Sequence, residues 1–454
     1  MKTRNPVLPA QYNSKCFLWC HDDDKNNLAI LFFNKKYKLI FEKVSFMCVI
    51  FCFHMKIFSI ISLFMGGLFF LSSCDWNGQK KPNKNLLTDS IQTGTIVYPN
   101  ESSVDYKEFN YERVAMIDSI IDKYVSRRQF NGVVLVGDKG AIIYQGVKGF
   151  GNHMTAEPLT LTTSFHLASV SKQFTSVAVM MLEEEGKLSY TDTVGRYIEN
   201  FPYKDITIHQ LLNHTSGLPD ISEYIPQFLG FWDTCKIAVN NDIPWILSNL
   251  KPSVKFLPGR RFSYSNTGYI ILALIVERVS GLTYGDFLKQ RIFDPLQMNH
   301  TFVYNYSDFS GCPVTAKAYT TYKYSYVPFE DDIRNGLVGE KGVYSSATDL
   351  FKWDQALYGY QLLSQQTIDK AFSRGELVNG KQIDYGYGWR IPRKADNIVY
   401  HFGYWKGSRA AFIRVLDKQY TIIILNNTSS KKIRTIVREI LDILYMNADD
   451  KPVF

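Results

Sequence analysis

A serine and a lysine stand three positions apart at the start of an apolar segment. Ser169 opens the tetrapeptide Ser-Val-Ser-Lys, and Lys172 closes it. If a helix begins here, the two side chains lie one turn apart on the same face, and the serine hydroxyl lies at the positive end of the helix dipole. A lysine whose pKa is lowered by burial or by neighbouring positive charge can take the hydroxyl proton. The pair therefore predicts a nucleophile and its base.

Two later motifs add groups that such a nucleophile needs. Tyr264 and Asn266 stand two residues apart, so their side chains point the same way from an extended or tight-loop segment. The phenol can move a proton, and the carboxamide can hold Lys172 and a substrate carbonyl. His401 begins the one His-x-Gly sequence of the chain, just before a strand-like segment. Gly403 would let a substrate approach an edge strand closely.

Each of these patterns alone also arises by chance. Ser-x-x-Lys recurs at Ser248 and Ser429, and Tyr-x-Asn recurs at Tyr98 and Tyr445. Ser248 lies just before Pro252 and opens no predicted helix, and no supporting motif follows Ser429. What distinguishes the three motifs is their order, with 95 residues from the first to the second and 137 from the second to the third.

Five longer segments surround these motifs. They are Phe165-His-Leu-Ala-Ser-Val-Ser-Lys-Gln-Phe174, Leu211-Leu-Asn-His-Thr-Ser-Gly-Leu-Pro219, Phe256-Leu-Pro-Gly259, Tyr264-Ser-Asn-Thr-Gly-Tyr269 and Gly342-Val-Tyr-Ser-Ser-Ala-Thr-Asp-Leu350. Through them the chain, over about residues 105–445, resembles the serine β-lactamase and penicillin-binding protein superfamily. The resemblance is strongest to the class C β-lactamase-like branch, which also contains DD-peptidases, D-aminopeptidases and esterases.

The resemblance implies a role for each matching residue. Ser169 corresponds to the acylated nucleophile and Lys172 to its base partner. Tyr264 corresponds to the residue that relays protons to the leaving group and activates water for deacylation. Asn266 corresponds to the amide that orients the substrate. His401 stands where many relatives have the lysine of a Lys-Thr-Gly motif, and the class C-like branch often has histidine.

The same resemblance implies where the oxyanion hole lies, and the sequence departs from the family pattern at two positions. The backbone N–H groups of Ser169 and Tyr404 would form the hole. Phe402 replaces a Thr or Ser whose hydroxyl helps relatives to hold a substrate carboxylate, and His401, neutral at pH 7 unless perturbed, replaces a fixed cation. Both departures argue against penicillins and D-Ala-D-Ala. The side chains of Tyr404 and Trp405 would either form an aromatic wall for an apolar acyl group or simply pack.

Other notable residues near these motifs have plainer interpretations. Lys406 or Arg409 could supply the missing cation, but a solvated surface position is the expectation for both. Glu340 and Lys341 are expected at the edge of a loop. The segment His214-Thr-Ser-Gly217 is expected to be scaffold beside the site, with its serine in a turn rather than a second nucleophile.

Hydrophobic periodicity predicts the elements that must position these residues. Helices are expected at 111–124, 171–188 and 431–445, a hairpin at 132–137 and 141–144, and late strands at 385–391, 409–415 and 420–425. The order predicts an α+β, β-lactamase/transpeptidase-like fold: an antiparallel sheet flanked by N- and C-terminal helices, plus a mostly helical insert.

The first hundred residues predict export and anchoring. Lys56 precedes an apolar run from 57 to 71, which is too short to span a membrane comfortably, and Ser72-Ser73-Cys74 follows. This resembles the lipobox of bacterial lipoproteins, in which the cysteine is lipidated. The alternative is a signal-anchor helix that starts upstream, since 39–53 is also largely apolar.

The domain boundaries follow from the anchor. Residues 1–54 are a doubtful upstream extension that an early start codon would explain, and 55–73 are the lipoprotein signal peptide. Residues 74–105 are a polar tether, and 106–446 form the hydrolase domain. The expected location is the bacterial cell envelope, with the protein lipid-anchored there.

Composition and net charge limit the kinds of partner that we expect. The chain of 454 residues is 46% hydrophobic and 15% aromatic, which excludes disorder for most of it. Its net charge of +8 comes from 51 Lys and Arg against 43 Asp and Glu. The first 73 residues hold nine of the former and four of the latter, so the remainder carries a net charge of +3. We therefore expect no nucleic-acid partner, but a small-molecule or peptide substrate, a membrane reached through the anchor, and a monomer.

Together these features predict a serine hydrolase that acts through an acyl-enzyme, without metal or organic cofactor, on small esters, amides or D-amino-acid peptides. One alternative is a DD-peptidase or β-lactamase that acts on peptidoglycan or β-lactams. A non-enzymatic alternative is an acyl-trapping sensor or binding module on the same fold. The intact Tyr264 argues against the sensor, because a protein that only traps ligand can lose its deacylation machinery.

Overall fold

The computed structural model describes residues 20–21, 28–29, 111–221, 223–224, 237–305, 313–322, 325–330 and 332–446. The chain divides into two compact units, Met1–Asp89 and Ser90–Phe454. In the first, β1 (Cys20–His21) pairs antiparallel with β2 (Leu28–Ala29). The predicted signal peptide, Cys74 and the tether lie outside the described residues, so these boundaries stay predictions.

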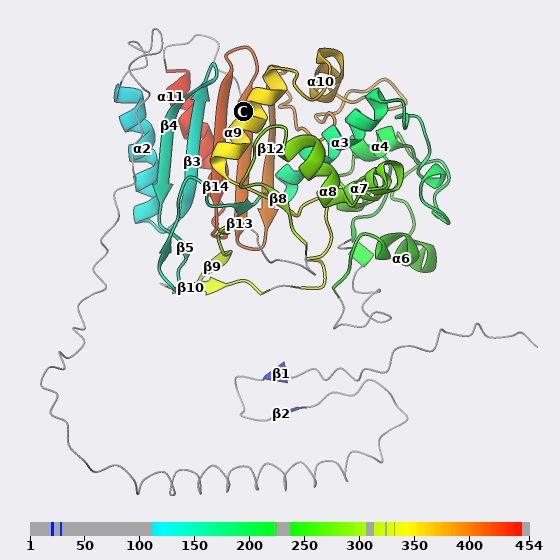
Figure 1. The fold of residues 1–454 in the computed structure, drawn as a ribbon, viewed down its shortest axis with the longest axis horizontal. Coiled ribbons are helices and arrows are strands. Elements are labelled where there is room, and N and C mark those ends of the chain that lie inside the picture. The colour runs from blue at the N-terminus through cyan, green and yellow to red at the C-terminus, as the bar shows by residue number, and fades with distance from the viewer. Residues whose placement is uncertain are drawn as a thin grey trace, which may run out of the picture. The chain divides into compact units, whose positions relative to one another are not determined.

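A five-stranded antiparallel sheet is the centre of the second unit (Figure 1). Its strands, in spatial order, are β12 (Ile398–Trp405), β13 (Ser408–Val415), β14 (Tyr420–Asn426), β3 (Gly132–Asp138) and β4 (Ala141–Lys148). The N-terminal hairpin thus pairs with the last strand of the chain, which leaves β12 at one edge. Valine is the commonest residue of β3 and isoleucine that of β14, and both strands are buried along almost all of their length.

Helices from the two ends of the domain cover one face of the sheet. These are α2 (Tyr111–Ser126) and α11 (Ile433–Leu444), which also contact each other. Their apolar stripes pack on the sheet residues that point to this side, among them Val134, Ile413 and Ile424. Glu439 ties the two helices together, because its carboxylate accepts a hydrogen bond from the Tyr124 hydroxyl at 2.8 Å.

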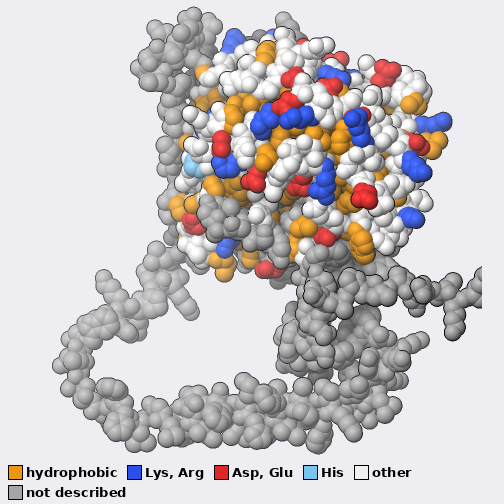
Figure 2. Space-filling view, turned by 45° about the vertical axis from the view of Figure 1, so that its right-hand side comes forward, with side chains coloured by type: hydrophobic (Ala, Val, Ile, Leu, Met, Phe, Trp, Pro, Cys, Tyr) orange, Lys and Arg blue, Asp and Glu red, His pale blue; other side chains and the backbone are white. Residues whose placement is uncertain are grey.

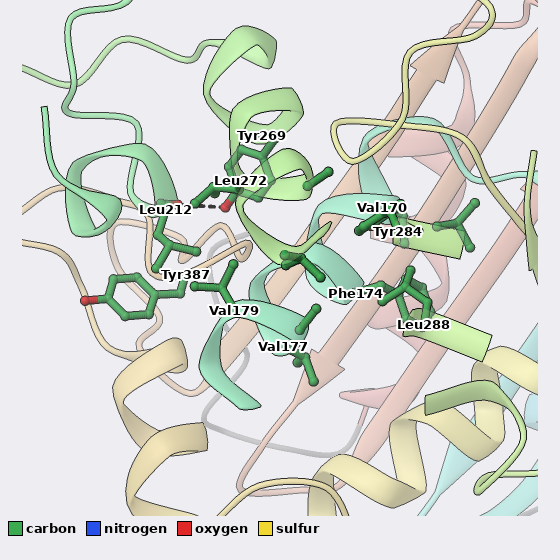
Figure 3. Close-up of a cluster of buried hydrophobic side chains, with 14 of the residues drawn as sticks. Val170, Phe174, Val177, Val179, Leu212, Tyr269, Leu272, Tyr284, Leu288 and Tyr387 are labelled. Carbon is green, nitrogen blue, oxygen red and sulfur yellow. Dashed lines mark hydrogen bonds between the residues drawn. The ribbon is translucent and has the colours of Figure 1, made fainter. Parts of the chain in front are cut away.

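The opposite face carries the helical part of the domain. The 3-10 helix η2 (Ala168–Ser171) leads directly into α3 (Lys172–Glu184), which packs against α7 (Asn266–Ser280). Figure 3 shows the apolar side chains that join these helices, and in it the Tyr269 hydroxyl donates to the Leu212 carbonyl at 2.7 Å. The α9 helix (Ala347–Tyr358) lies against β3 and β14.

Shorter elements complete the domain. The helices are η3 (Val194–Arg196), α4 (Ile208–Leu212), α6 (Asp242–Leu250), α8 (Tyr284–Leu288), the π-helix η4 (Lys289–Phe293) and α10 (Gln365–Phe372). The strands are β5 (Phe150–Asn152), β6 (Glu157–Pro158), β7 (Phe165–His166), β8 (Phe302–Val303), β9 (Tyr319–Tyr322), β10 (Ser325–Pro328) and β11 (Val343–Ser345). A small three-stranded sheet has the order β7-β11-β8, and its strand β7 lies just before Ser169 in the sequence.

The α+β prediction is confirmed, with one strand misplaced. The three predicted helices, the hairpin and the strands at 409–415 and 420–425 are all present. The strand predicted at 385–391 is wrong: these residues form only isolated bridges, Tyr385 with Arg390 and Arg390 with Tyr400. Gly388 adopts a φ of +84° there, which turns the chain, and the aromatic residues around it are buried as core. The edge strand is instead β12.

The charged side chains on the surface are distributed as a modest net charge predicts. On the face that Figure 2 shows, Lys and Arg side chains lie interspersed with Asp and Glu, with hydrophobic side chains between them. None of the helices among the described residues is both long and apolar enough to cross a membrane.

Candidate active site

Ser169 and Lys172 come together at the start of the helical layer. Ser169 lies in η2 and Lys172 is the first residue of α3, and the lysine Nζ lies 3.3 Å from the serine Oγ. Ala168, immediately before the serine, has a φ of +49°, and its N–H donates to His166 Nδ1 at 2.9 Å. The chain therefore turns sharply into the helix and presents Ser169 at the N-terminal end, where the helix dipole favours negative charge.

Two carbonyl oxygens fix the amine of Lys172. Its Nζ donates to Asn266 Oδ1 at 2.8 Å and to the Glu340 backbone oxygen at 2.7 Å. Lys172 is fully buried, and burial lowers its pKa to about 7. In the neutral amine the two carbonyls occupy both N–H groups, so the lone pair faces Ser169. Lysine in this setting can act as a base at neutral pH.

Tyr264 lies over the same amine. Lys172 Nζ is 4.9 Å from the centroid of its ring. Burial raises the pKa of Tyr264 above its usual range, and the nearby Ser169 hydroxyl opposes the rise. The phenol oxygen forms no hydrogen bond with any residue that the structure describes, and this includes Ser169. Tyr264 is therefore a neutral phenol that holds a proton next to the nucleophile.

The segment around His214 holds Tyr264 in place. His214 adopts a φ of +60°, and its ring lies 4.3 Å from the Tyr264 ring, centroid to centroid. Its carbonyl accepts the Ser263 N–H at 2.9 Å, and its Nδ1 accepts the Ser265 N–H at 3.2 Å. These contacts are consistent with the prediction that 214–217 is scaffold, and they show that His214 supports the segment that carries Tyr264.

His401 lies on the other wall of the site. It stands inside β12, not before a strand as predicted. Its Nδ1 lies 2.8 Å from the Phe402 carbonyl, which can only accept, so Nδ1 carries the proton, and Nε2 lies 3.2 Å from the Tyr385 hydroxyl. Burial lowers the pKa of His401 well below its usual range, and Arg390 and Lys172 add to the effect. The ring is therefore neutral, as the sequence indicated.

Strand alternation decides which residues after His401 point toward the site. His401, Gly403 and Trp405 share one face of β12, and Phe402 and Tyr404 share the other. A Cβ at Gly403 would lie 2.1 Å from the Leu167 carbonyl oxygen. The packing of η2 on β12 therefore requires a glycine at this position, and the expected approach of substrate to Gly403 stays a prediction.

The same alternation decides which aromatic residue faces the site. Phe402 is buried in the core under α11, and the Tyr404 hydroxyl accepts a hydrogen bond from Arg434 Nε on that helix at 3.0 Å. The Tyr404 side chain forms no wall of the site, so only its backbone N–H stays a candidate oxyanion donor. Trp405 lies on the side of the site, with Lys341 Nζ 4.9 Å from its ring centroid.

Two cations expected at the solvated surface are instead tied to the backbone. Lys406 Nζ donates to the Glu330 carbonyl, and only 14% of the lysine side chain is exposed. Arg409 donates to the Lys406 carbonyl at 2.6 Å and to the Ser429 carbonyl at 3.2 Å. Neither hydrogen-bonds to His401 in the part of the chain that the structure describes.

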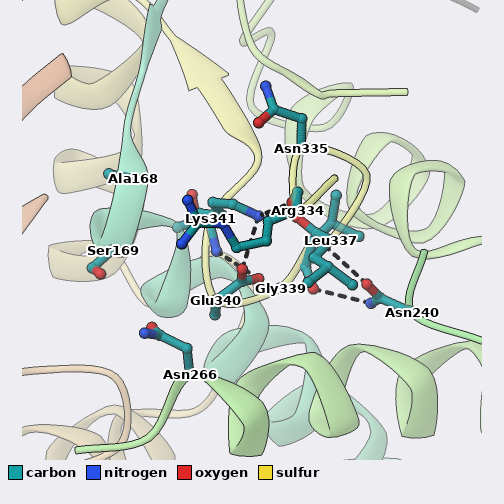
Figure 4. A network of polar contacts seen from close by, with 12 residues as sticks. Ala168, Ser169, Asn240, Asn266, Arg334, Asn335, Leu337, Gly339, Glu340 and Lys341 are labelled. Carbon is teal, nitrogen blue, oxygen red and sulfur yellow. Dashed lines mark hydrogen bonds and ion pairs between the residues drawn. The ribbon is translucent and has the colours of Figure 1, made fainter. Parts of the chain in front are cut away.

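Sequence reasoning missed three groups of the site. Asp220 accepts the Asn266 N–H at 2.7 Å and so fixes the amide that holds Lys172. Glu340 was predicted at a loop edge, but it is buried and supplies a carbonyl to Lys172. Figure 4 shows Glu340 between Lys341 and Asn266. These contacts join distant parts of the chain, and no local pattern marks them.

Arg390 is the third missed group. Its guanidinium carbon lies 5.2 Å from the centroid of the Tyr264 ring and 5.7 Å from that of Tyr385. Arg390 is partly exposed, and no hydrogen bond or ion pair joins its side chain to any residue that the structure describes. An available cation beside Tyr264 can bind an anionic group of a ligand. Across the same described ranges, no cluster of His, Cys, Asp and Glu suits a metal ion.

Comparisons with known proteins find similar sequences and a similar fold. The profile of the β-lactamase family matches residues 117–443. Penicillin-binding protein 4* of Bacillus subtilis (strain 168) is 40% identical over 329 residues, which cover 68% of this chain and 71% of that protein. The D-aminopeptidase of Brucella anthropi is 26% identical over 298 residues, which cover 65% of this chain but 56% of that protein. The octameric penicillin-binding protein homologue from Pyrococcus abyssi superposes with a TM-score of 0.64 at 26% identity, covering 73% of this chain and 77% of that one.

Proposed function

This chain belongs to the β-lactamase family, and on that premise we propose that it is a serine hydrolase that forms an acyl-enzyme on Ser169 with D-amino-acid peptides ending in a free carboxylate. The observation that carries the proposal is the buried amine of Lys172. Its Nζ lies 3.3 Å from Ser169 Oγ, and two carbonyls occupy its other hydrogen-bonding directions.

In acylation, the neutral Lys172 amine takes the hydroxyl proton while Ser169 Oγ bonds to the substrate carbonyl carbon. The negative charge that develops on the carbonyl oxygen is bound by the backbone N–H groups of Ser169 and Tyr404. The bond from carbon to the leaving nitrogen then breaks. Tyr264 gives its proton to that nitrogen and regains one from the ammonium of Lys172, so the amine leaves neutral.

Deacylation repeats the sequence with water. Tyr264 takes a proton from a water molecule and passes its own proton to the neutral amine of Lys172, as the water oxygen bonds to the acyl carbon. The bond from that carbon to Ser169 Oγ breaks, and the proton returns to the serine. Asn266 orients the acyl group throughout, because its Oδ1 is already fixed by the amine of Lys172 at 2.8 Å.

Arg390 supports a substrate with a carboxylate. The sequence argument against carboxylates rested on Phe402 and the neutral His401. Phe402, however, packs under α11, and an available guanidinium lies over the Tyr264 ring at 5.2 Å. A guanidinium can bind a carboxylate through two parallel hydrogen bonds. The names of relatives, penicillin-binding protein and D-aminopeptidase, support D-amino-acid chemistry in general.

The test compares two substrates that differ only in the anion. A D-Ala-D-Ala peptide with a free C-terminus and the same peptide as its C-terminal amide are incubated with the wild type, Ser169→Ala and Arg390→Gln. We expect the free acid to be preferred, no turnover by Ser169→Ala, and a KM for the acid at least about tenfold higher in Arg390→Gln, with little change for the amide. Equal use of both substrates by both active proteins would contradict carboxylate recognition.

Mass mapping separates an enzyme from a sensor. A fluorophosphonate and a fluorescent penicillin should each modify Ser169, and the penicilloyl adduct should be lost with time as deacylation proceeds. If the adduct persists and no peptide is hydrolysed, the chain is an acyl-trapping module. If neither reagent labels folded protein at Ser169, the proposed nucleophile is wrong.

We further propose that the mature protein is a lipid-anchored protein of the bacterial envelope. The support is the apolar run at 57–71 followed by Cys74, together with a polar segment of about thirty residues before α2. A tether of that length would let the hydrolase domain act on substrates near, but not in, the membrane.

A further inference from the structure

Glu340 and Lys341 are adjacent, oppositely charged and both buried beside the catalytic lysine. Each exposes only 5% of its surface, and Lys341 Nζ lies 2.9 Å from Glu340 Oε1. The backbone oxygen of Glu340 is the acceptor for Lys172 Nζ at 2.7 Å. One member of this buried ion pair, Glu340, is therefore also the residue whose backbone carbonyl contacts the proposed base.

The ion pair also closes the loop that carries this carbonyl. Lys341 Nζ donates to the carbonyls of Arg334 at 2.8 Å and Leu337 at 2.7 Å, so one ammonium binds three groups of its own loop (Figure 4). The Gly339 carbonyl accepts from Thr175 Oγ1 on α3 at 2.6 Å. The loop is fixed both internally and to the helix that carries Lys172.

We propose that the Glu340–Lys341 ion pair is a positioning element, which holds the Glu340 carbonyl against Lys172 and sets the pH at which Lys172 becomes a base. The proposal rests on the proposed function, in which Lys172 activates Ser169. Neither residue touches the substrate in this scheme.

A purely structural explanation accounts poorly for the pair. Burying two charges is expensive, and apolar residues of similar size often stabilise a fold equally well or better. A backbone carbonyl could also be presented by a neutral loop. What the ion pair adds is two opposite charges near Lys172, whose effects on the ammonium have opposite signs.

The sign of each effect follows from electrostatics. The groups that face Lys172 come from η2, the loops before α7, α7 itself, the 334–342 loop and the β12 side. They are Ser169, His214, Asp220, Tyr264, Asn266, Tyr269, Glu340, Lys341, Arg390 and His401. Of the charged ones, Glu340 and Asp220 raise the pKa of Lys172, whereas Lys341 and Arg390 lower it. Changing one member of the ion pair leaves Asp220 and Arg390 in place.

The test measures how the rate of Ser169 labelling by a fluorophosphonate depends on pH. Glu340→Gln removes a negative charge, so Lys172 loses its proton more easily and the midpoint should move to lower pH. Lys341→Met removes a positive charge, so the midpoint should move to higher pH. Each shift should be at least about half a pH unit. Glu185→Gln is the control, because Glu185 forms a surface ion pair with Lys187 at 2.8 Å; its midpoint should match the wild type.

The double variant Glu340→Gln/Lys341→Met tests the positioning part and leaves no unpaired buried charge, so it should fold even if a single variant does not. Its midpoint should lie near that of the wild type, and its maximal labelling rate should fall at least about tenfold, because the loop no longer fixes the carbonyl. A double variant as fast as the wild type would overturn the positioning role. Folded single variants with unshifted midpoints would overturn the electrostatic role. If the wild type itself is not labelled, the proposed function fails instead.

Discussion

At the scale of single residues, the state of Lys172 decides when Ser169 can react. Burial lowers the pKa of Lys172 to about 7, so the ammonium dominates at lower pH and the neutral amine at higher pH. Labelling of Ser169 by a fluorophosphonate should therefore accelerate as pH rises from 5 to 9, with a midpoint near pH 7. Lys172→Met should be slower by about 10²- to 10⁴-fold and lack this midpoint. A midpoint near the usual lysine pKa would contradict the assignment.

Tyr264 should matter most after the acyl-enzyme has formed. Its phenol keeps its proton at neutral pH, because burial raises its pKa, and it lies next to Lys172. Tyr264→Phe removes this proton relay with little change in shape. We expect the penicilloyl adduct on Ser169 to persist about 100-fold longer or more in the variant, as measured by intact mass over time. Loss at the wild-type rate would exclude Tyr264 from deacylation.

At the scale of elements, the site depends on how closely η2 packs on β12. Gly403 allows this contact, since a Cβ there would lie 2.1 Å from the Leu167 carbonyl oxygen. Gly403→Ala should push the two elements apart and slow acylation of Ser169 by about tenfold or more. Gly195→Ala is the matched control, because a Cβ at Gly195 meets nothing within 4 Å. Equal labelling rates for the two variants would show that the contact does not position the nucleophile.

A buried ion pair attaches the α9 helix to the five-stranded sheet. Asp354 on α9 accepts from Arg414 Nε on β13 at 2.6 Å and from the Thr421 hydroxyl at 2.7 Å, and the ion pair is fully buried. Asp354→Ala leaves a buried cation unpaired, so we expect the free energy of unfolding to fall by roughly 3–5 kcal/mol. Denaturant titration measures this loss. Asp294→Ala breaks the exposed pair with Lys289 and should remove only about 0.2–1 kcal/mol.

At the scale of the whole molecule, the N-terminal segment is predicted to decide where the enzyme works. Lipidation at Cys74 would keep the protein on membranes, although none of the described helices could span one. Cys74→Ala should release the protein from the membrane fraction of expressing cells, as measured by immunoblotting of fractionated lysates. Ser72→Ala, a change beside the cysteine that keeps a small residue, should stay membrane-bound. Continued association of the cysteine variant with membranes would favour the upstream signal-anchor helix.

Local patterns were enough to predict much of this protein. Ser169 and Lys172 lie one turn apart because helical geometry alone brings residues three positions apart together. The neutral His401 also follows the sequence prediction, and the contacts of His214 are consistent with the scaffold role predicted for 214–217. The strand expected at 385–391 was wrong for a local reason, since buried aromatic residues in a turning loop have the same apolar pattern as a strand.

By itself, therefore, the sequence determined the α+β class, the three ordered motifs and the family resemblance, because each depends on residue types and short-range spacing. Only the tertiary structure decided what surrounds the amine of Lys172. One of its acceptors comes from 94 residues away and the other from 168 residues away. It also decided that Arg390 lies over Tyr264, that Phe402 faces α11, and that a predicted loop edge is a buried ion pair. Such contacts depend on how distant segments pack, and periodicity along the chain carries no record of them.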